Sequence, residues 1–167
     1  MSAIVARKFC MLGGFAVGKT SLVGRFVRQV FDESYHTTIG VKIDTKQLEI
    51  DDRVVKITLW DLAGEDRFRT VQTAYLKGAA GYLLVLDRTR KDTLDVAKRI
   101  QERVQAEIGA MPFVVLANKS DLVDNLEITD AMMGQLSDGG WQVYATSAKT
   151  GENVEASFVN LARASLR

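Results

Sequence analysis

The stretch "GGFAVGKTSL", from Gly13 to Leu22, decides the fold, because three glycines and a lysine follow directly on the apolar run "KFCMLG". Gly13, Gly18, Lys19 and Thr20 fit the pattern G-x-x-x-x-G-K-[ST], and the helical run "TSLVGRFVRQVF" comes next. Glycines let backbone amides turn towards an anion, and the N-terminus of a helix adds partial positive charge. The stretch therefore predicts a nucleotide-phosphate site, and the alternative is a glycine-rich turn beside a surface lysine.

The side chains and backbone of this loop are expected to surround the phosphates. Lys19 would neutralise the terminal phosphates, and Thr20 would offer its hydroxyl to Mg²⁺. Nucleotide contacts are predicted for Gly13, Phe15, Ala16, Val17, Gly18, Lys19, Thr20 and Ser21.

Short apolar runs rich in branched residues alternate with amphipathic segments along the chain. The expected strands are "KFCMLG" (8–13), "VVKITLWD" (54–61), "GYLLVLD" (81–87), "FVVLANK" (113–119) and "WQVYATS" (141–147). Helices are expected after the glycine-rich loop, over 92–109 with Gly109 as the stop, and along the C-terminal apolar stripe from Val154 to Ser165 or Leu166. This alternation predicts an α/β fold, with a mostly parallel sheet covered by helices on both faces.

One pair of strands departs from the alternation. "VKIDTKQLEI" (41–50) and "RVVKITLW" (53–60) are separated only by Asp51 and Asp52, so we predict a hairpin whose first strand lies at an edge. Together with the four other expected strands, this hairpin predicts a six-stranded sheet with one antiparallel edge strand. Without repeats or a linker, the chain is predicted to be a single domain over residues 1–167.

The composition narrows the class of protein. With 22 basic and 21 acidic residues, the net charge of +1 gives no field for nucleic acid or an anionic membrane. No apolar stretch approaches the roughly 18 to 20 residues of a membrane span. Cys10 is the one cysteine, so we expect a small apolar residue in a strand and a reducing, cytoplasmic setting.

The segment "NKSD", Asn118 to Asp121, closes a buried strand at the sheet edge where α/β proteins place ligands. Asp121 can accept hydrogen bonds from N1 and the 2-amino group of guanine. Adenine would leave that carboxylate unpaired, so the chemistry selects GTP and GDP over ATP. Taken alone, the four polar residues could instead cap a strand. The other expected base contacts are Asn118, Lys119 and, in "TSAK", the Ala148 amide buttressed by Ser147, with Lys149 beside them.

The segment "WDLAG" closes another strand. Asp61 can hold Mg²⁺ through water, and the Gly64 amide is free to meet a terminal phosphate. Thr38 in "YHTTIG" is a candidate for a second Mg²⁺ contact, although a loop threonine by itself more often caps its neighbours. Loops fastened only by metal and a terminal phosphate must loosen when that phosphate leaves, which is the physics of a switch.

These pieces, in this order, resemble the small GTPases of the Ras superfamily over essentially the whole chain. "TTIGVKI", "WDLAGEDRFRTV" and "AYLKGAAGYLLVLDRT" are most similar to the Rab branch. The resemblance implies the P-loop small G-protein fold, binding of GTP and GDP with Mg²⁺, slow hydrolysis of GTP, and recruitment of effectors in the GTP state. It also implies an exchange factor, an activating protein, Phe31 stacked against the guanine edge, and Tyr35 over the phosphates.

The alternation in "VVKITLWD" places Trp60 on the polar face of its strand, where a tryptophan suggests a docking surface. The resemblance implies that Ile43, Trp60 and Tyr75 form the apolar triad that Rab-like proteins present to effectors. Ile43 stands where an aromatic is usual and Lys42 where an acid is usual, so known Rab effectors need not bind. The alternative is that a neighbouring loop covers Trp60.

The catalytic residues implied by the resemblance are Lys19, Gly64 and the residue after "WDLAG", and here the chain departs from the family. Glu65 replaces the usual glutamine. A carboxylate accepts a hydrogen bond from water but cannot donate one to the phosphate, and the γ-phosphate repels its charge, so hydrolysis could fall. A raised pKa could instead let Glu65 take up a proton, or Arg67 or Arg69 could simply pair with it.

Phe15 is the second departure, because the family has a small residue there. A phenyl ring is expected to crowd the place where the γ-phosphate, the water and an activating arginine must converge, unless it folds outward. We predict intrinsic turnover at or below roughly 10⁻⁴ s⁻¹. The rival hypothesis is a scaffold that holds GTP or GDP permanently as an interaction module.

The chain carries no lipidation signal, because Ser2 follows Met1 and the end "LARASLR" has no cysteine. Rab-like proteins are expected to have a tail that ends in prenylated cysteines. Either such a tail is missing from this chain, and membrane association would then be possible, or the protein works without a lipid anchor. We also expect a monomer.

Overall fold

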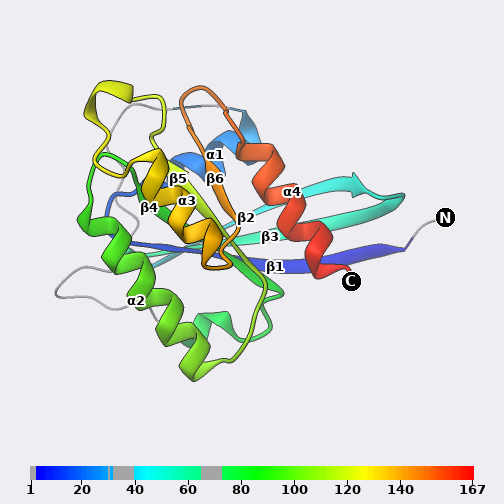
Figure 1. Cartoon of the computed structure of the whole chain (residues 1–167). Coiled ribbons are helices and arrows are strands. Elements are labelled where there is room, and N and C mark those ends of the chain that lie inside the picture. Colours follow the sequence, from blue (N-terminus) through cyan, green and yellow to red (C-terminus); the bar gives the residue numbers. More distant parts are fainter. Residues whose placement is uncertain (1–2, 30, 32–39, 65–72) are drawn as a thin grey trace.

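The strand that precedes the glycine-rich loop lies inside a β-sheet (Figure 1). This computed structural model describes residues 3–29, 31, 40–64 and 73–167. Within these residues the sheet has six strands. The strand order is β2-β3-β1-β4-β5-β6. The strands are β1 (Ile4–Gly13), β2 (Val41–Ile50), β3 (Arg53–Leu62), β4 (Gly81–Asp87), β5 (Phe113–Asn118) and β6 (Val143–Ala145). Only β2 pairs antiparallel among these strands, which confirms the predicted α/β fold with one antiparallel edge strand.

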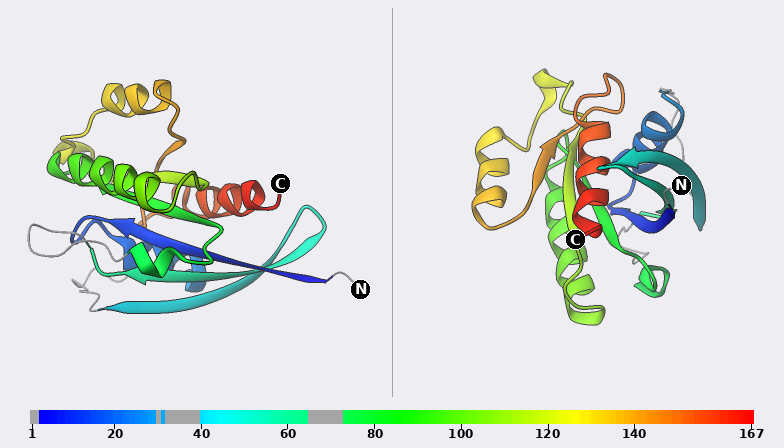
Figure 2. Two further views of the ribbon diagram at one scale, coloured as in Figure 1. Left: turned by 90° about the horizontal axis from the view of Figure 1, so that it is seen from below. Right: turned by 90° about the vertical axis from the view of Figure 1, so that its right-hand side faces the viewer.

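Helices cover both faces of the sheet. Those of the described residues are α1 (Lys19–Arg28), α2 (Asp92–Glu107), α3 (Asp130–Asp138) and α4 (Val154–Ser165), with short 3₁₀ turns η1 (Thr73–Leu76) and η2 (Val123–Asn125). Phe26 of α1 stacks on Phe158 of α4 at 4.2 Å between ring centroids, within the core of one face. Leu94, Ile100 and Val104 of α2 belong to the core of the opposite face. In the right-hand view of Figure 2, α1 and α3 lie on opposite sides of the molecule.

The hairpin between β2 and β3 has the predicted two-residue turn. Asp51 has φ 50° and Asp52 has φ 66°, and Ile50 pairs with Arg53 across the turn. Positive φ at both central residues matches a type I′ turn, whose twist suits that of the strands. Helix α2 also ends as predicted, because Gly109 takes φ 102° and its N–H donates to the Val104 carbonyl.

Some element bounds differ from the sequence prediction. β1 begins at Ile4, before the apolar run, because Ile4 to Lys8 pair with β3. β6 is only three residues long, and Trp141, expected in that strand, instead packs edge-on against Phe113 at 5.8 Å. Helix α3 was not predicted, since none of its residues is buried. Its sequence signal is Thr129, whose hydroxyl accepts the Met132 N–H as an N-cap.

Candidate nucleotide-binding site

The glycine-rich loop lies at the carboxyl ends of the parallel strands. β1 ends at Gly13, β4 at Asp87 and β5 at Asn118, and Asp61 lies at the same end of β3. Parallel strands bring these ends to one edge of the sheet, where ligands of α/β proteins bind. Gly13, Asp61 and Asn118, predicted for the phosphate, the metal and the base, therefore gather at this edge.

Three consecutive carbonyl groups of the loop accept hydrogen bonds from side chains of other segments. The Phe15 carbonyl accepts from Nη2 of Arg90 at 2.7 Å, the Ala16 carbonyl from Nζ of Lys119 at 3.3 Å, and the Val17 carbonyl from Nδ2 of Asn118 at 3.0 Å. Because a trans peptide points its N–H away from its carbonyl, the N–H groups that follow face the other side of the loop. Ala16 has φ 58°, as expected where successive N–H groups form an anion-binding nest.

Gly18 and Gly64 of the site have no room for a side chain. A Cβ on Gly18 would lie 2.3 Å from Nδ2 of Asn118, and Gly18 has φ 104°. A Cβ on Gly64 would lie 2.7 Å from the Gly14 carbonyl oxygen and 2.9 Å from the Phe15 Cα. Gly64 of "WDLAG" thus lies directly against the phosphate loop, and the predicted contact of its amide with a terminal phosphate stays a prediction.

Lys19 begins α1 and is buried. Its Nζ lies 3.4 Å from the Gly14 carbonyl oxygen. Burial lowers the pKa of the Lys19 ammonium to about 8, and the Asp61 carboxylate opposes that shift. A buried cation whose charge is costly gains the most from an anion placed beside it, so Lys19 suits the phosphate role.

The two described oxygen ligands proposed for Mg²⁺ lie together. The Thr20 hydroxyl donates to Oδ2 of Asp61 at 2.6 Å, and Asp61 is buried. A hydroxyl and a carboxylate beside a phosphate site are the hard oxygen donors that Mg²⁺ takes together with phosphate oxygens. Thr20 and Asp61 therefore fit the ion. The third candidate, Thr38, lies outside the described residues.

The two base-recognition segments are joined to each other. The Ser147 hydroxyl donates to Oδ1 of Asp121 at 2.8 Å, and the Thr146 hydroxyl donates to Oδ1 of Asn118 at 3.3 Å. Ser147 and Ala148 are buried, and Lys149 is exposed. The structure thus brings "NKSD" and "TSAK" together beside the phosphate loop, as the sequence predicted.

Other predicted residues are placed only in part. Phe31 is half-buried against the core between α1, α4 and the sheet, and its contact with a base stays a prediction. Phe15 is 42% exposed, and whether its ring crowds the γ-phosphate also stays a prediction. Tyr35, Thr38 and Glu65 lie outside the described residues.

A polar turn after β4, "DRTR" (87–90), reaches the site and was missed by the sequence analysis. Asp87 is buried and accepts from Nζ of Lys119 at 2.9 Å and from Nε of Arg90 at 3.0 Å. Burial raises the pKa of Asp87, but hydrogen bonds from Thr89, Lys119 and Arg90 outweigh it, and the pKa is lowered. An acid directly after a buried strand was the signal available in the sequence.

Arg88 of the same turn is also buried. Its Nε donates to the Ile128 carbonyl at 3.0 Å, Nη1 to the Ser120 hydroxyl at 3.3 Å, and Nη2 to Oδ1 of Asp130 at 2.8 Å. Arg88 therefore holds the "NKSD" segment to the segment that leads into α3.

The apolar triad lies on the sheet face that carries α2. Ile43 of β2 pairs with Trp60 of β3, and the Trp60 and Tyr75 rings are 6.1 Å apart. Ile43 is 52% exposed and Tyr75 is 39% exposed, whereas Trp60 is half-buried, with Nζ of Lys8 3.8 Å from its ring centre. The three side chains form one surface, and Trp60 is partly covered within it.

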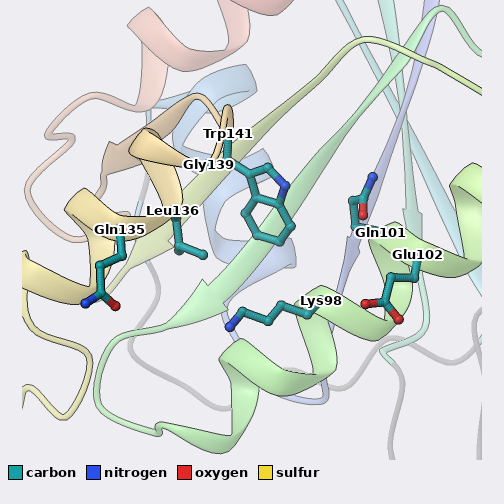
Figure 3. A pocket seen from close by; sticks show the side chains of 7 residues that line it. All are labelled: Lys98, Gln101, Glu102, Gln135, Leu136, Gly139 and Trp141. Atoms are coloured by element: carbon teal, nitrogen blue, oxygen red, sulfur yellow. The ribbon is translucent and has the colours of Figure 1, made fainter.

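A separate pocket lies between α2 and α3 (Figure 3). It has a volume of about 220 Å³ and shares no residue with the nucleotide site. Its lining consists of Lys98, Gln101, Glu102, Gln135, Leu136, Gly139 and Trp141.

No helix of the described residues is long and apolar enough to cross a membrane.

A glycine-rich loop between a central strand and a helix, with base-recognition segments at the same sheet edge, defines a P-loop nucleotide-binding protein. Residues 8–167 match the model of the Ras family, and the chain belongs to that family. It is Rab-like, with 36% identity over 161 residues to "Ras-related protein Rab-8B" of Homo sapiens, covering 93% of this chain and 76% of that protein. The identity to "Ras-related protein Rab-8A" of Bos taurus is 35% over the same length and shares. GTP binding and GTPase activity are properties of this family.

Proposed function

We propose that this protein binds GTP and GDP with Mg²⁺, hydrolyses GTP slowly, and recruits effectors in the GTP state. The observation that carries the proposal is the set of side-chain bonds from "NKSD" to the phosphate loop. Asn118 and Lys119 hold the carbonyls of Val17 and Ala16, so base recognition and phosphate binding form one connected site.

The phosphates would be held by the N–H groups of the loop and by Lys19, which gains a partner for its buried charge. Thr20 and Asp61 would hold Mg²⁺, which neutralises phosphate charge when bound. Asp121, oriented by Ser147 at 2.8 Å, would accept from the base edge of guanine. ATP offers no donor pair to that carboxylate, which supports selectivity for guanine.

Hydrolysis is proposed to be slow because of two residues. Glu65 cannot donate a hydrogen bond to the γ-phosphate, as the usual glutamine does. Phe15 would place a ring at the loop position where the γ-phosphate, the attacking water and an activating arginine must converge. Both effects act on the transferring phosphate, so they lower turnover without weakening recognition of the base.

The surface of Ile43, Trp60 and Tyr75 is the proposed effector site. It adjoins the nucleotide site through the chain, because Trp60 precedes Asp61 on β3. Two exposed apolar side chains around a half-buried tryptophan are typical of a docking surface. An exchange factor and an activating protein would act on the same switch.

The test is a single-turnover assay. The protein is loaded with GTP and Mg²⁺, and phosphate release and the identity of the bound nucleotide are followed over hours. Conversion to GDP at or below roughly 10⁻⁴ s⁻¹ supports the switch, and faster unassisted turnover contradicts the proposed effect of Glu65 and Phe15.

The rival function is a GTP-holding scaffold. GTP that stays intact, with hydrolysis restored by Glu65→Gln or Phe15→Gly, would show that these two residues keep the protein in its GTP form. Failure to retain GTP or GDP at all would overturn both functions.

A further inference from the structure

We propose that Arg90, held in place by Asp87, is a positioning residue of the phosphate loop that sets how slowly guanine nucleotide is released. This inference rests on the proposed nucleotide binding and concerns a residue outside the loop and its motif. Arg90 belongs to the turn between β4 and α2, and its guanidinium reaches the carbonyl of Phe15 across 75 positions of the sequence.

The guanidinium makes two directed bonds. Its Nε donates to Oδ2 of Asp87 at 3.0 Å, and its Nη2 donates to the Phe15 carbonyl at 2.7 Å. The planar fork of arginine fixes the directions of these two donors relative to each other. Because the Asp87 side chain is 1% exposed at the end of a central strand, Arg90 is anchored to the buried sheet.

Asp87 anchors a second cation that does the same for the next carbonyl. Nζ of Lys119 lies 2.9 Å from Oδ2 of Asp87 and 3.3 Å from the Ala16 carbonyl oxygen. One buried carboxylate therefore holds two cations, and these hold two consecutive carbonyls of the loop. The Thr89 N–H and hydroxyl donate to its other oxygen, Oδ1, at 2.8 and 2.6 Å, which fixes the carboxylate itself.

These bonds act on the phosphate side of the loop. A cation at the Phe15 carbonyl keeps that peptide turned so that the Ala16 N–H faces the opposite side, and it polarises the peptide so that this N–H is a stronger donor. Ala16 is held in the left-handed conformation, with φ 58°, which the loop must otherwise maintain by itself. Loss of Arg90 therefore frees the Phe15–Ala16 peptide to rotate, and the hydrogen bond from the Ala16 N–H to the phosphates becomes weaker.

The test compares Arg90→Ala with a matched control, Arg103→Ala, on protein loaded with fluorescent GDP. Both arginine side chains are 37% exposed and both bind a carboxylate through Nε, but Arg103 pairs with Glu107 within α2 and is not bonded to the loop. We expect Arg90→Ala to release GDP about 5- to 20-fold faster, because a partly screened charged hydrogen bond is lost. Arg103→Ala should release GDP at the wild-type rate. Arg90→Lys has one side-chain nitrogen in place of the two that donate to Asp87 and to the Phe15 carbonyl, so its release rate should lie between those of the wild type and Arg90→Ala.

Two spectroscopic readouts separate positioning from general loosening of the fold. Arg90→Ala should shift the ³¹P resonance of the β-phosphate of bound GDP and the amide ¹⁵N resonance of Ala16, while Arg103→Ala shifts neither. Unchanged GDP release in Arg90→Ala, faster release with unchanged resonances, or equal effects of the two alanine variants would overturn the inference. A wild-type protein that does not retain GDP would overturn the proposed function itself, which is a different result.

Discussion

A methyl group at position 18 would meet Nδ2 of Asn118 at 2.3 Å, and the backbone there has φ 104°. Gly18→Ala should therefore lower the free energy of unfolding by about 1–3 kcal/mol and weaken GDP binding, because the Asn118 bond to the Val17 carbonyl must shift. Urea unfolding and a GDP titration measure the two effects. Gly134→Ala is the control: in α3 its Cβ meets no atom of the described residues within 4 Å, and it should stabilise by about 0.5–1 kcal/mol. Equal losses of stability and of GDP binding in Gly18→Ala and Gly134→Ala would contradict the predicted clash at position 18.

The second prediction at this scale concerns Asp87 and pH. Its pKa in the folded protein is lowered from 3.8, so the ionised carboxylate contributes stability that is present above that value and is lost as the pH falls below it. Asp87→Asn should lower the free energy of unfolding by about 2–4 kcal/mol at pH 7, because two cations lose their shared partner. Urea unfolding of both proteins should show that the difference shrinks below pH 3.8. A difference that stays constant down to pH 3 would show that the charge of Asp87 does not matter.

Single residues were predictable where a contiguous motif carries them. Lys19, Thr20 and Asn118 belong to short patterns with fixed spacing, and the structure brings them together. Asp87 and Arg90 read as part of a polar turn, and their function depends on the Phe15 and Ala16 carbonyls, which lie about 70 positions earlier in the chain. Such contacts arise from the order of strands in the sheet, which local spacing does not contain.

At the scale of elements, the β2–β3 turn offers a stability prediction. Asp52 has φ 66° and is exposed, so it occupies a left-handed position of a type I′ turn where glycine is preferred. Asp52→Gly should raise the free energy of unfolding by about 0.5–1 kcal/mol, because the backbone strain of a side chain there is removed. Thermal and urea unfolding of the wild type and of Asp52→Gly measure this change in the free energy of unfolding.

The control for the turn is Asp138→Gly at the end of α3, where the backbone is helical. Glycine there should lower stability by up to about 1 kcal/mol. If both substitutions destabilise, the strain at Asp52 is compensated by contacts of its side chain, and the prediction is wrong.

Strands and long helices were predictable because burial on one or both faces gives them a periodic pattern. Helix α3 was not predicted, because none of its residues is buried and it therefore lacks the apolar period that packing imposes. β6 was predicted, but as a longer strand over 141–147; only its half-buried residues Val143–Ala145 pair with β5. The N-cap at Thr129 was a local signal for α3.

At the scale of the whole molecule, the fold places the proposed effector surface next to the metal ligands. Trp60 pairs with Ile43, packs on Tyr75, and precedes Asp61, which bonds Thr20 at the start of α1. Gly64, three positions further on, lies against the phosphate loop. A rearrangement at the terminal phosphate is therefore separated from the tryptophan by only a few residues of chain.

This proximity predicts that the tryptophan reports the nucleotide state. The chain has two tryptophans, so Trp141→Phe leaves Trp60 as the single emitter. Exchange of GDP for a non-hydrolysable GTP analogue should change the emission of this variant, because Gly64 and Asp61 would be held by the γ-phosphate and Mg²⁺ and the Trp60 surroundings would be repacked. A Trp60→Phe variant, which retains Trp141 far from the site, should show no change.

The emission also discriminates between the two proposed functions. In a switch, the GTP-form emission of the Trp141→Phe variant returns to the GDP-form value at the rate of phosphate release in the single-turnover assay. In a scaffold that holds GTP, the GTP-form emission persists for hours and returns only after Glu65→Gln or Phe15→Gly restores hydrolysis. Identical emission in the GDP and GTP-analogue forms would contradict coupling altogether, because the apolar surface would then be the same in both states and nucleotide exchange could not regulate a partner that binds there.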